Sequence, residues 1–240
     1  LFTPNNVFQS YIDTVLPSLG ESNPQSFTWR NFIESQGIAD RANGRDTDPA
    51  ELKKMETTVK GLTLEPDDLR GISVGDVQLI KASQVKNAFA KFPRTPLGPR
   101  LIAMVKDVLH ERLETRLTNL SRDEGVHEEM LGADIEDQIA VFGEPINPVD
   151  EADTTRLAKL YVDHKYSDVH DLIETAGWLR IDRIGQRLLG HQLNAAEYLY
   201  LRSLITGAGD RNARYVMVDE VQDYSPAQLM VMARYFSNAH

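Results

Sequence analysis

The strongest constraint in this sequence is a change of pattern that occurs twice along the chain. Short apolar segments alternate with helical segments over residues 1–35 and again over residues 191–240, whereas residues 36–190 show helical spacing almost throughout. Alternating strands and helices are typical of an α/β sheet. The pattern therefore predicts an α/β core built from both ends of the chain and interrupted by a large, mostly α-helical insertion.

The first 35 residues predict two short strands, each followed by a helix. Residues 1–3 have the character of the end of a buried strand. An apolar stripe at helical spacing follows Asn6 and stops at Pro17, which cannot continue a helix. Residues 25–28 form the second strand candidate, and a helical turn is expected over residues 29–33.

The last 50 residues repeat this alternation with clearer helix starts. Asn194 followed three residues later by Glu197 is a capping-box pattern, which predicts a helix that ends near Gly207. The apolar run 215–218 predicts a short buried strand. Ser225 followed by proline predicts the start of the last helix, with serine as N-cap.

Helical spacing in the insertion predicts most of its elements. A proline at the first position supports a helix over residues 49–60, and Ser83 is expected to cap the next one. Trp178 is expected to anchor the core, and the six histidines show no metal-ligand spacing. We expect a short strand over residues 76–82 and helices over residues 49–60, 83–92, 100–120, 155–163, 168–176 and 179–192.

Composition excludes several classes of protein. The chain has no cysteine, which rules out disulfides, a thiol nucleophile, Cys-ligated zinc and iron–sulfur clusters. No apolar run is long enough to cross a membrane and no signal peptide is visible, so we expect a cytoplasmic protein. The abrupt apolar start at Leu1 and the amphipathic helix just before His240 suggest a piece of a longer protein.

The clearest chemical motif follows the apolar run 215–218. Asp219 and Glu220 come directly after it, and ligands of phosphate-handling α/β proteins bind beyond the carboxyl ends of strands. There Asp219 could hold Mg²⁺ through water, while Glu220 orients or deprotonates an attacking water. Gln222 could sense a γ-phosphate, and Asp223 is grouped with Asp219 as nucleotide-binding. The alternative is a strand end followed by an acidic loop.

The run Asp219–Asp223 resembles motif II, the Walker B box, of superfamily-1 helicases of the UvrD/Rep class. Residues 1–6 resemble their motif Ia, and residues 25–28 resemble motif Ib. The similarity is greatest to the HelD family of RNA polymerase-associated, helicase-like proteins, both after Phe2 and over the run Asp219–Pro226. These matches are confined to the two ends of the chain, and the insertion matches only loosely.

The resemblance implies a partial RecA-like (P-loop NTPase) core, ATP and Mg²⁺ as cofactors, and RNA polymerase and nucleic acid, most simply DNA, as partners. It also implies that Thr3, Asn5 and Thr28 contact the backbone of a single strand. The alternative for the two threonines is that they cap the helices that follow. A DNA helicase or translocase in repair or recombination, and a non-catalytic interaction arm, remain as alternative functions.

The family's phosphate-binding loop, which ends in Gly-Lys-Thr, would lie before Leu1, and motif III would lie after His240. The backbone and lysine of that loop cradle the β- and γ-phosphates. We therefore expect the larger protein, and not these 240 residues alone, to hydrolyse ATP.

Charge is distributed very unevenly within the insertion. Residues 81–122 carry nine Lys/Arg and three Asp/Glu, whereas residues 123–153 carry eleven Asp/Glu and no Lys or Arg, in a chain whose net charge is −10. A block of like charge predicts either a solvated loop or an interaction segment. By resemblance, the block would enter the basic nucleic-acid channel of RNA polymerase, supported by the helix over 100–120. The residues expected to bind this partner are Glu128, Glu129, Glu136 and Asp137.

Overall fold

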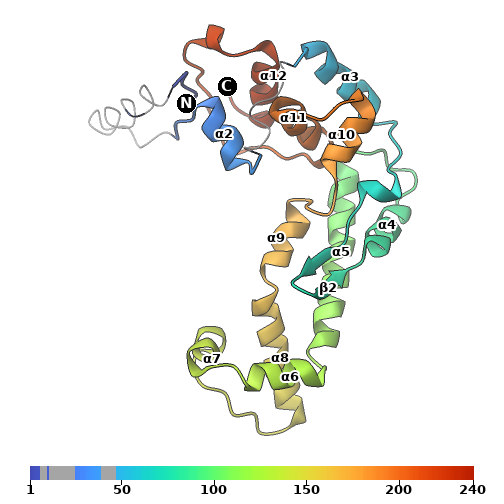
Figure 1. Ribbon diagram of the computed structural model, residues 1–240, viewed down its shortest axis with the longest axis vertical. Coiled ribbons are helices and arrows are strands. Elements are labelled where there is room, and N and C mark those ends of the chain that lie inside the picture. Colours follow the sequence, from blue (N-terminus) through green and yellow to red (C-terminus); the bar gives the residue numbers. More distant parts are fainter. Residues whose placement is uncertain (6–9, 11–24, 39–46) are drawn as a thin grey trace. The chain divides into compact units, whose positions relative to one another are not determined.

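A computed structural model describes residues 1–5, 10, 25–38 and 47–240 of the chain (Figure 1). The helix expected between Asn6 and Pro17 lies outside these residues. The described part is mostly helical and contains one two-stranded antiparallel sheet. The expected mixture of helices and strands is therefore confirmed, with helices strongly predominant. No helix in the described ranges is both long and apolar enough to span a membrane.

The chain divides into two compact units. The first contains residues 1–63, 96–99 and 181–240, and the second contains residues 64–95 and 100–180. Both ends of the chain thus belong to one unit. This unit also includes residues 36–63 and 181–190, which the sequence analysis assigned to the insertion.

Helix starts in the first unit follow the capping signals in the sequence. The Oγ atom of Thr28 accepts a hydrogen bond from the backbone N–H of Asn31, and Ser225 caps the last helix with Gln228 in a capping box. Asn194 forms the expected capping box, and Gly207 ends the same helix with a positive φ of 73° that favours glycine. The helices of this unit are α2 (Trp29–Ser35), α3 (Pro49–Val59), α10 (Ile181–Leu189), α11 (Ala195–Thr206) and α12 (Pro226–Tyr235).

The core of the first unit forms around α11. This helix packs against α3, α10 and α12, and Leu199, Leu201 and Ile205 on it are almost fully buried. A second, aromatic part of the core surrounds Phe2, which is 1% exposed. The Phe2 ring centroid lies 5.3 Å from that of Phe32, in an edge-to-face arrangement.

The second unit is built on one long helix and a hairpin. Its elements are the 3₁₀ turn Pro66–Asp68, strands β1 (Ile72–Val74) and β2 (Val77–Ile80), and helices α4 (Ala82–Ala90), α5 (Pro99–Leu120, from Arg100 on), α6 (Glu124–Leu131), α7 (Ile135–Phe142), α8 (Glu151–Lys165) and α9 (Asp168–Glu174). Strand β1 was not predicted from the sequence. Helix α4 has Lys81 as its N-cap, so the prediction that Ser83 caps this helix is wrong.

The core of the second unit runs along α5. Its residues Val105, Leu109, Leu113 and Leu117 are fully buried, which confirms the expected apolar stripe. Trp178 is also fully buried, and its indole N–H donates to the carbonyl of Ile173 at 3.2 Å. It is therefore the core anchor that the sequence predicted.

Helices α5 and α9 are joined by a chain of polar side chains. The Nδ1 atoms of His110 and His170 lie 3.1 Å apart, and Nε2 of His110 lies 2.7 Å from a carboxylate oxygen of Glu174. Lys106 donates to the same carboxylate at 3.3 Å. These histidines are 60 residues apart, which is why sequence spacing did not connect them.

The acidic block 123–153 is folded, which contradicts its interpretation as a loop. It contains α6, α7 and the start of α8. Met130 on α6 is fully buried and packs against Leu157 and Ala158 on α8. Acidic residues precede each of these helices or occupy its first turn, where their charge is favourable to the helix dipole. They are Asp123 and Glu124 for α6, Asp134, Glu136 and Asp137 for α7, and Asp150, Glu151 and Asp153 for α8.

Candidate functional site

Three segments that are distant in sequence lie side by side in the first unit. Phe2 forms parallel bridges with Phe27 on one side and with Val218 on the other. The backbone N–H of Phe2 donates to the carbonyl of Met217 at 2.8 Å, and the N–H of Asp219 donates to the carbonyl of Phe2 at 3.0 Å. The segment around Phe2 is therefore the central one of the three.

Parallel pairing brings the carboxyl ends of these segments to the same edge. Thr3 follows Phe2, Thr28 follows Phe27, and Asp219 follows Val218. The N–H of Thr3 donates to the carbonyl of Phe27 at 2.8 Å, which fixes the register. Three segments that the sequence placed at the edge of a sheet are thus brought together.

The run 215–218 is not the buried strand that was expected. It contributes an isolated bridge at Val218, and Tyr215 and Met217 are 72% and 66% exposed. Val216 and Val218 are half-buried. Exposed and half-buried positions thus alternate along the run, as expected for an extended segment with one covered face.

The acidic run itself forms a tight turn. Asp219 is half-buried, and Glu220 is exposed with a φ of 49°, a left-handed conformation that is costly for a residue other than glycine. A 3₁₀ turn over Val221–Asp223 follows, and the amide of Gln222 donates to the Glu220 carboxylate. Two adjacent carboxylates therefore project beyond the carboxyl end of a parallel-paired segment, where oxygen ligands could hold a hard divalent cation.

Tyr224 ties this turn to the central segment. Its hydroxyl donates to the carbonyl of Thr3 at 2.8 Å in a buried environment. Burial, together with the carboxylates of Asp219 and Asp223, raises the pKa of Tyr224 to about 12. No role was predicted for this residue from the sequence. The sequence shows that Tyr224 lies directly before the last helix, but this position does not reveal its hydrogen-bond partner, because Thr3 lies at the other end of the chain.

The residues expected to contact nucleic acid differ in accessibility. Thr3 is 0% exposed and Thr28 is 6% exposed, whereas Asn5 is exposed. The Oγ atom of Thr28 accepts the N–H of Asn31 at 3.1 Å, which matches the alternative in which this threonine caps a helix. Thr3 donates from Oγ1 to the carbonyl of Asn5 at 3.4 Å. Neither hydroxyl is presented at the surface.

The four acidic residues expected to bind a partner lie in the second unit and are not equivalent. Glu128, Glu136 and Asp137 are exposed. Glu129 is exposed as well, but it accepts hydrogen bonds from Lys165 and from the hydroxyl of Tyr161, the latter at 2.8 Å. The hydrogen bond from Lys165 lowers the pKa of Glu129 below its ordinary value. Glu129 therefore joins α6 to α8.

A separate group of possible metal ligands lies in the first unit. Side-chain atoms of Glu51, His191 and Glu197 lie within 4.8 Å of one another. Glu197 is fully buried, and its carboxylate accepts the N–H of Asn194 at 3.0 Å as part of the capping box of α11. Nε2 of His191 lies 3.2 Å from the same carboxylate. Because the cluster has this structural role, we do not assign it to a cofactor.

This chain matches no protein-family profile and no curated protein.

Proposed function

We propose that this chain is part of an ATP-dependent, superfamily-1 helicase-like motor, most specifically of the HelD type that remodels or recycles RNA polymerase. The observation that carries the proposal is the position of the run Asp219–Asp223. It begins where a parallel-paired segment ends, beside the segment that holds Thr3. This is the arrangement that a RecA-like core built from both chain ends requires of motifs Ia and II.

The residues present fit a Mg²⁺–nucleotide site at this edge. Asp219 would hold the metal through water, and Asp223 would lie close to it in the same turn. Glu220 would accept a proton from the attacking water, and Gln222, which donates to Glu220, would hold that carboxylate in place. When bound, Mg²⁺ would neutralise charge on the β- and γ-phosphates.

The test uses the full-length protein that contains this chain. Glu220→Gln should retain ATP binding and lose roughly 100-fold or more of the hydrolysis rate, because an amide cannot act as a general base. Asp219→Ala should weaken both Mg²⁺-dependent binding and hydrolysis. Glu111→Gln, an exposed change on α5, should leave the rate unchanged.

A Glu220→Gln variant that hydrolyses ATP at the parental rate would remove the basis for the proposal. The 240 residues contain no Gly-Lys-Thr sequence, so the chain alone should show no ATPase activity. Robust hydrolysis by the chain alone would also contradict the proposal.

The acidic helices α6 and α7 support the choice of RNA polymerase as the partner. Their exposed carboxylates could bind the basic groups that line a nucleic-acid channel. Such attraction is screened over about 8 Å at physiological salt, so binding should weaken as salt rises. Neutralising Glu128, Glu136 and Asp137 should slow association with polymerase more than it speeds dissociation.

A matched control neutralises three exposed acidic residues outside the block: Asp107, Glu111 and Asp171. Equal effects of the two triple variants would mean that net charge, and not the block, controls binding. Unchanged association rates in both would favour the alternatives, a DNA helicase or translocase or a non-catalytic arm. DNA unwinding by the full-length protein without any polymerase affinity would select the helicase.

A further inference from the structure

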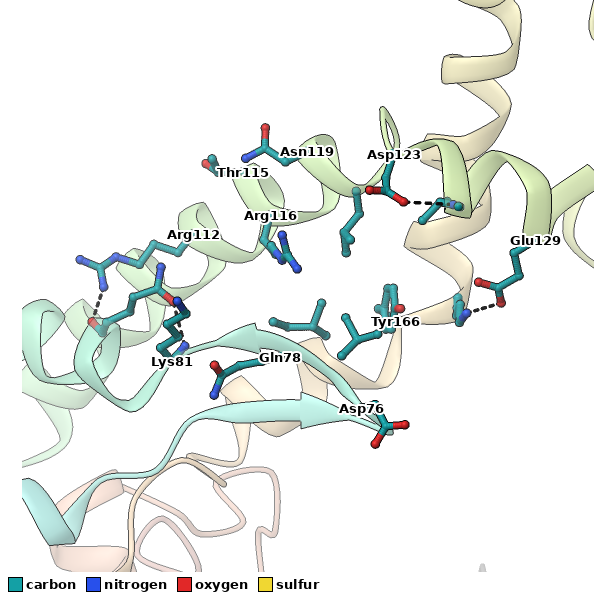
Figure 2. A pocket seen from close by; sticks show the side chains of 17 residues that line it. Asp76, Gln78, Lys81, Arg112, Thr115, Arg116, Asn119, Asp123, Glu129 and Tyr166 are labelled. Atoms are coloured by element: carbon teal, nitrogen blue, oxygen red, sulfur yellow. Dashed lines mark hydrogen bonds and ion pairs between the residues drawn. The ribbon is translucent and has the colours of Figure 1, made fainter.

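A cleft of about 750 Å³ opens in the second unit, beside the β1–β2 hairpin (Figure 2). Its other walls come from α4, α5, α6 and the end of α8. This volume is within the range of small-molecule sites, roughly 300–1,000 Å³. Its lining residues all belong to the second unit, whereas the run Asp219–Asp223 belongs to the first.

One end of the cleft is cationic. Arg112 and Arg116 are four residues apart on α5 and so share one face of the helix, and Lys81 lies across from them at the start of α4 (Figure 2). Arg112 donates to the carbonyl of Gln84. In the described part of the chain, no carboxylate forms an ion pair with any of these three cations, and Arg116 forms no hydrogen bond either.

The opposite end is acidic. Asp76 lies in the hairpin turn, and Asp123 caps α6 by accepting the N–H of Val126. Glu129 lies at the same end, where Lys165 forms an ion pair with it and balances its charge. Figure 2 shows the two ends clearly, with Arg112 and Lys81 at one side and Asp76 and Glu129 at the other.

Apolar side chains separate the two ends. Val77 and Leu79 of β2 face the cleft from the hairpin, and Leu120, Val126 and Tyr166 contribute from the helices. A ligand that matches this order has an anionic end, an apolar body and a polar end with hydrogen-bond donors.

We propose that this cleft binds a nucleoside phosphate. Its phosphates lie on Arg112, Arg116 and Lys81. A guanidinium group can donate two parallel hydrogen bonds to two phosphate oxygens, and the three positive charges match the charge of a di- or triphosphate. The nucleoside lies over the apolar middle. Its hydroxyl or amino groups donate to Asp76 and Asp123, which as ionised carboxylates can only accept.

The charges disfavour two other anionic ligands. A nucleic-acid strand that ran the length of the cleft would carry phosphates into Asp76 and Asp123. An acidic peptide would meet the same repulsion and would not use the apolar middle. A ligand with charge at one end only avoids both costs.

The test measures binding of ADP to the 240-residue chain by calorimetry and by chemical-shift changes of the cleft residues. Arg116→Gln should weaken ADP binding about tenfold or more, the equivalent of one charge-assisted hydrogen bond. Its side chain has no partner in the described part, so the fold should be retained, and circular dichroism verifies this. Arg122→Gln removes the same charge from an exposed residue outside the cleft and should change affinity less than about twofold.

Further arms separate this site from the proposed motor site and from other ligands. Arg116→Gln should weaken ADP binding by the same factor in an Asp219→Asn background as in the parent chain, because motif II is in the other unit. A loss from Arg116→Gln that disappears in that background, equal losses in the two arginine variants, or no ADP binding at millimolar concentration would each overturn the proposal. If pyrophosphate binds as tightly as ADP, the nucleoside contributes no affinity and the proposed contacts with it are wrong. A single-stranded oligonucleotide or a poly-glutamate peptide that binds more tightly than ADP would replace the nucleotide as the ligand.

Discussion

Replacing Met130 with alanine tests whether the acidic block is a folded part of the second unit. Met130 is 0% exposed and packs between α6 and α8, against Leu157 and Ala158. Truncating a buried methionine to alanine costs roughly 2–5 kcal/mol, because the apolar contacts are lost and a cavity remains. The adjacent Leu131 is 46% exposed, so Leu131→Ala should cost less than about 0.5 kcal/mol.

The two variants form a matched pair. Both shorten an apolar side chain on α6 to the same residue, so helix propensity changes little between them. Urea unfolding followed by circular dichroism should therefore show a lower midpoint for Met130→Ala only. In thermal unfolding, each kcal/mol lost should lower the melting temperature by roughly 4 °C, given the length of the second unit, residues 64–95 and 100–180.

A protease specific for glutamate gives a second measurement. Four glutamates of the block lie within α6 and α7, Glu124, Glu128 and Glu129 on α6 and Glu136 on α7, and cleavage after them requires local opening of these helices. Met130→Ala should accelerate this cleavage, and Leu131→Ala should not. If both variants unfold and are cleaved like the parent, Met130 does not hold α6 in place and the solvated-loop interpretation is correct.

Three further changes have defined outcomes. Glu129→Gln should destabilise the protein at pH 7 by less than about 1 kcal/mol, since this carboxylate is half exposed. Urea titrations at several pH values should show this difference disappearing as pH falls below 4.5 and through the lowered pKa of Glu129. Asn194→Ala should cost about 1 kcal/mol, measured by thermal unfolding, because the capping box of α11 is lost. Tyr224→Phe should cost roughly 1 kcal/mol and remove a phenol whose pKa is about 12, which spectroscopic pH titration detects.

The sign of the pH effect at Glu129 follows from its lowered pKa. The hydrogen bond from Lys165 favours the ionised form in the folded state, so this bond stabilises the protein fully above the unfolded-state pKa of about 4.5. The contribution is lost when pH falls through the lower folded-state pKa. Glutamine cannot ionise, so the variant lacks this dependence.

Local signals in the sequence predicted local structure well. The apolar stripe of α5, the capping box at Asn194 and the Ser225 start of α12 were all confirmed, because each depends on residues within one or two helical turns. The helical fold of the acidic block could not be read from the sequence for the opposite reason. Eight of its eleven acidic residues lie at three successive helix starts. The few apolar residues that hold the block, such as Met130, have their partners on another helix.

Strands were harder to predict than helices. The hairpin was half missed because β1 has three residues and its pairing with β2 is not visible in either segment alone. The run 215–218 was overestimated because its composition suits a buried strand, yet burial depends on what covers each face. In this run Tyr215 and Met217 are exposed, whereas Val216 and Val218 are half-buried.

At the candidate site, the sequence predicts which residues carry the chemistry but not where they lie. The carboxylates of Asp219 and Glu220 can be recognised in the sequence, but their location depends on bonds to the first three residues. The carbonyl of Phe2 accepts the N–H of Asp219, and the carbonyl of Thr3 accepts the hydroxyl of Tyr224. Loss of either bond would release one end of the acidic turn from the central segment. Any function of this turn therefore depends on two backbone carbonyls at the other end of the chain, those of Phe2 and Thr3.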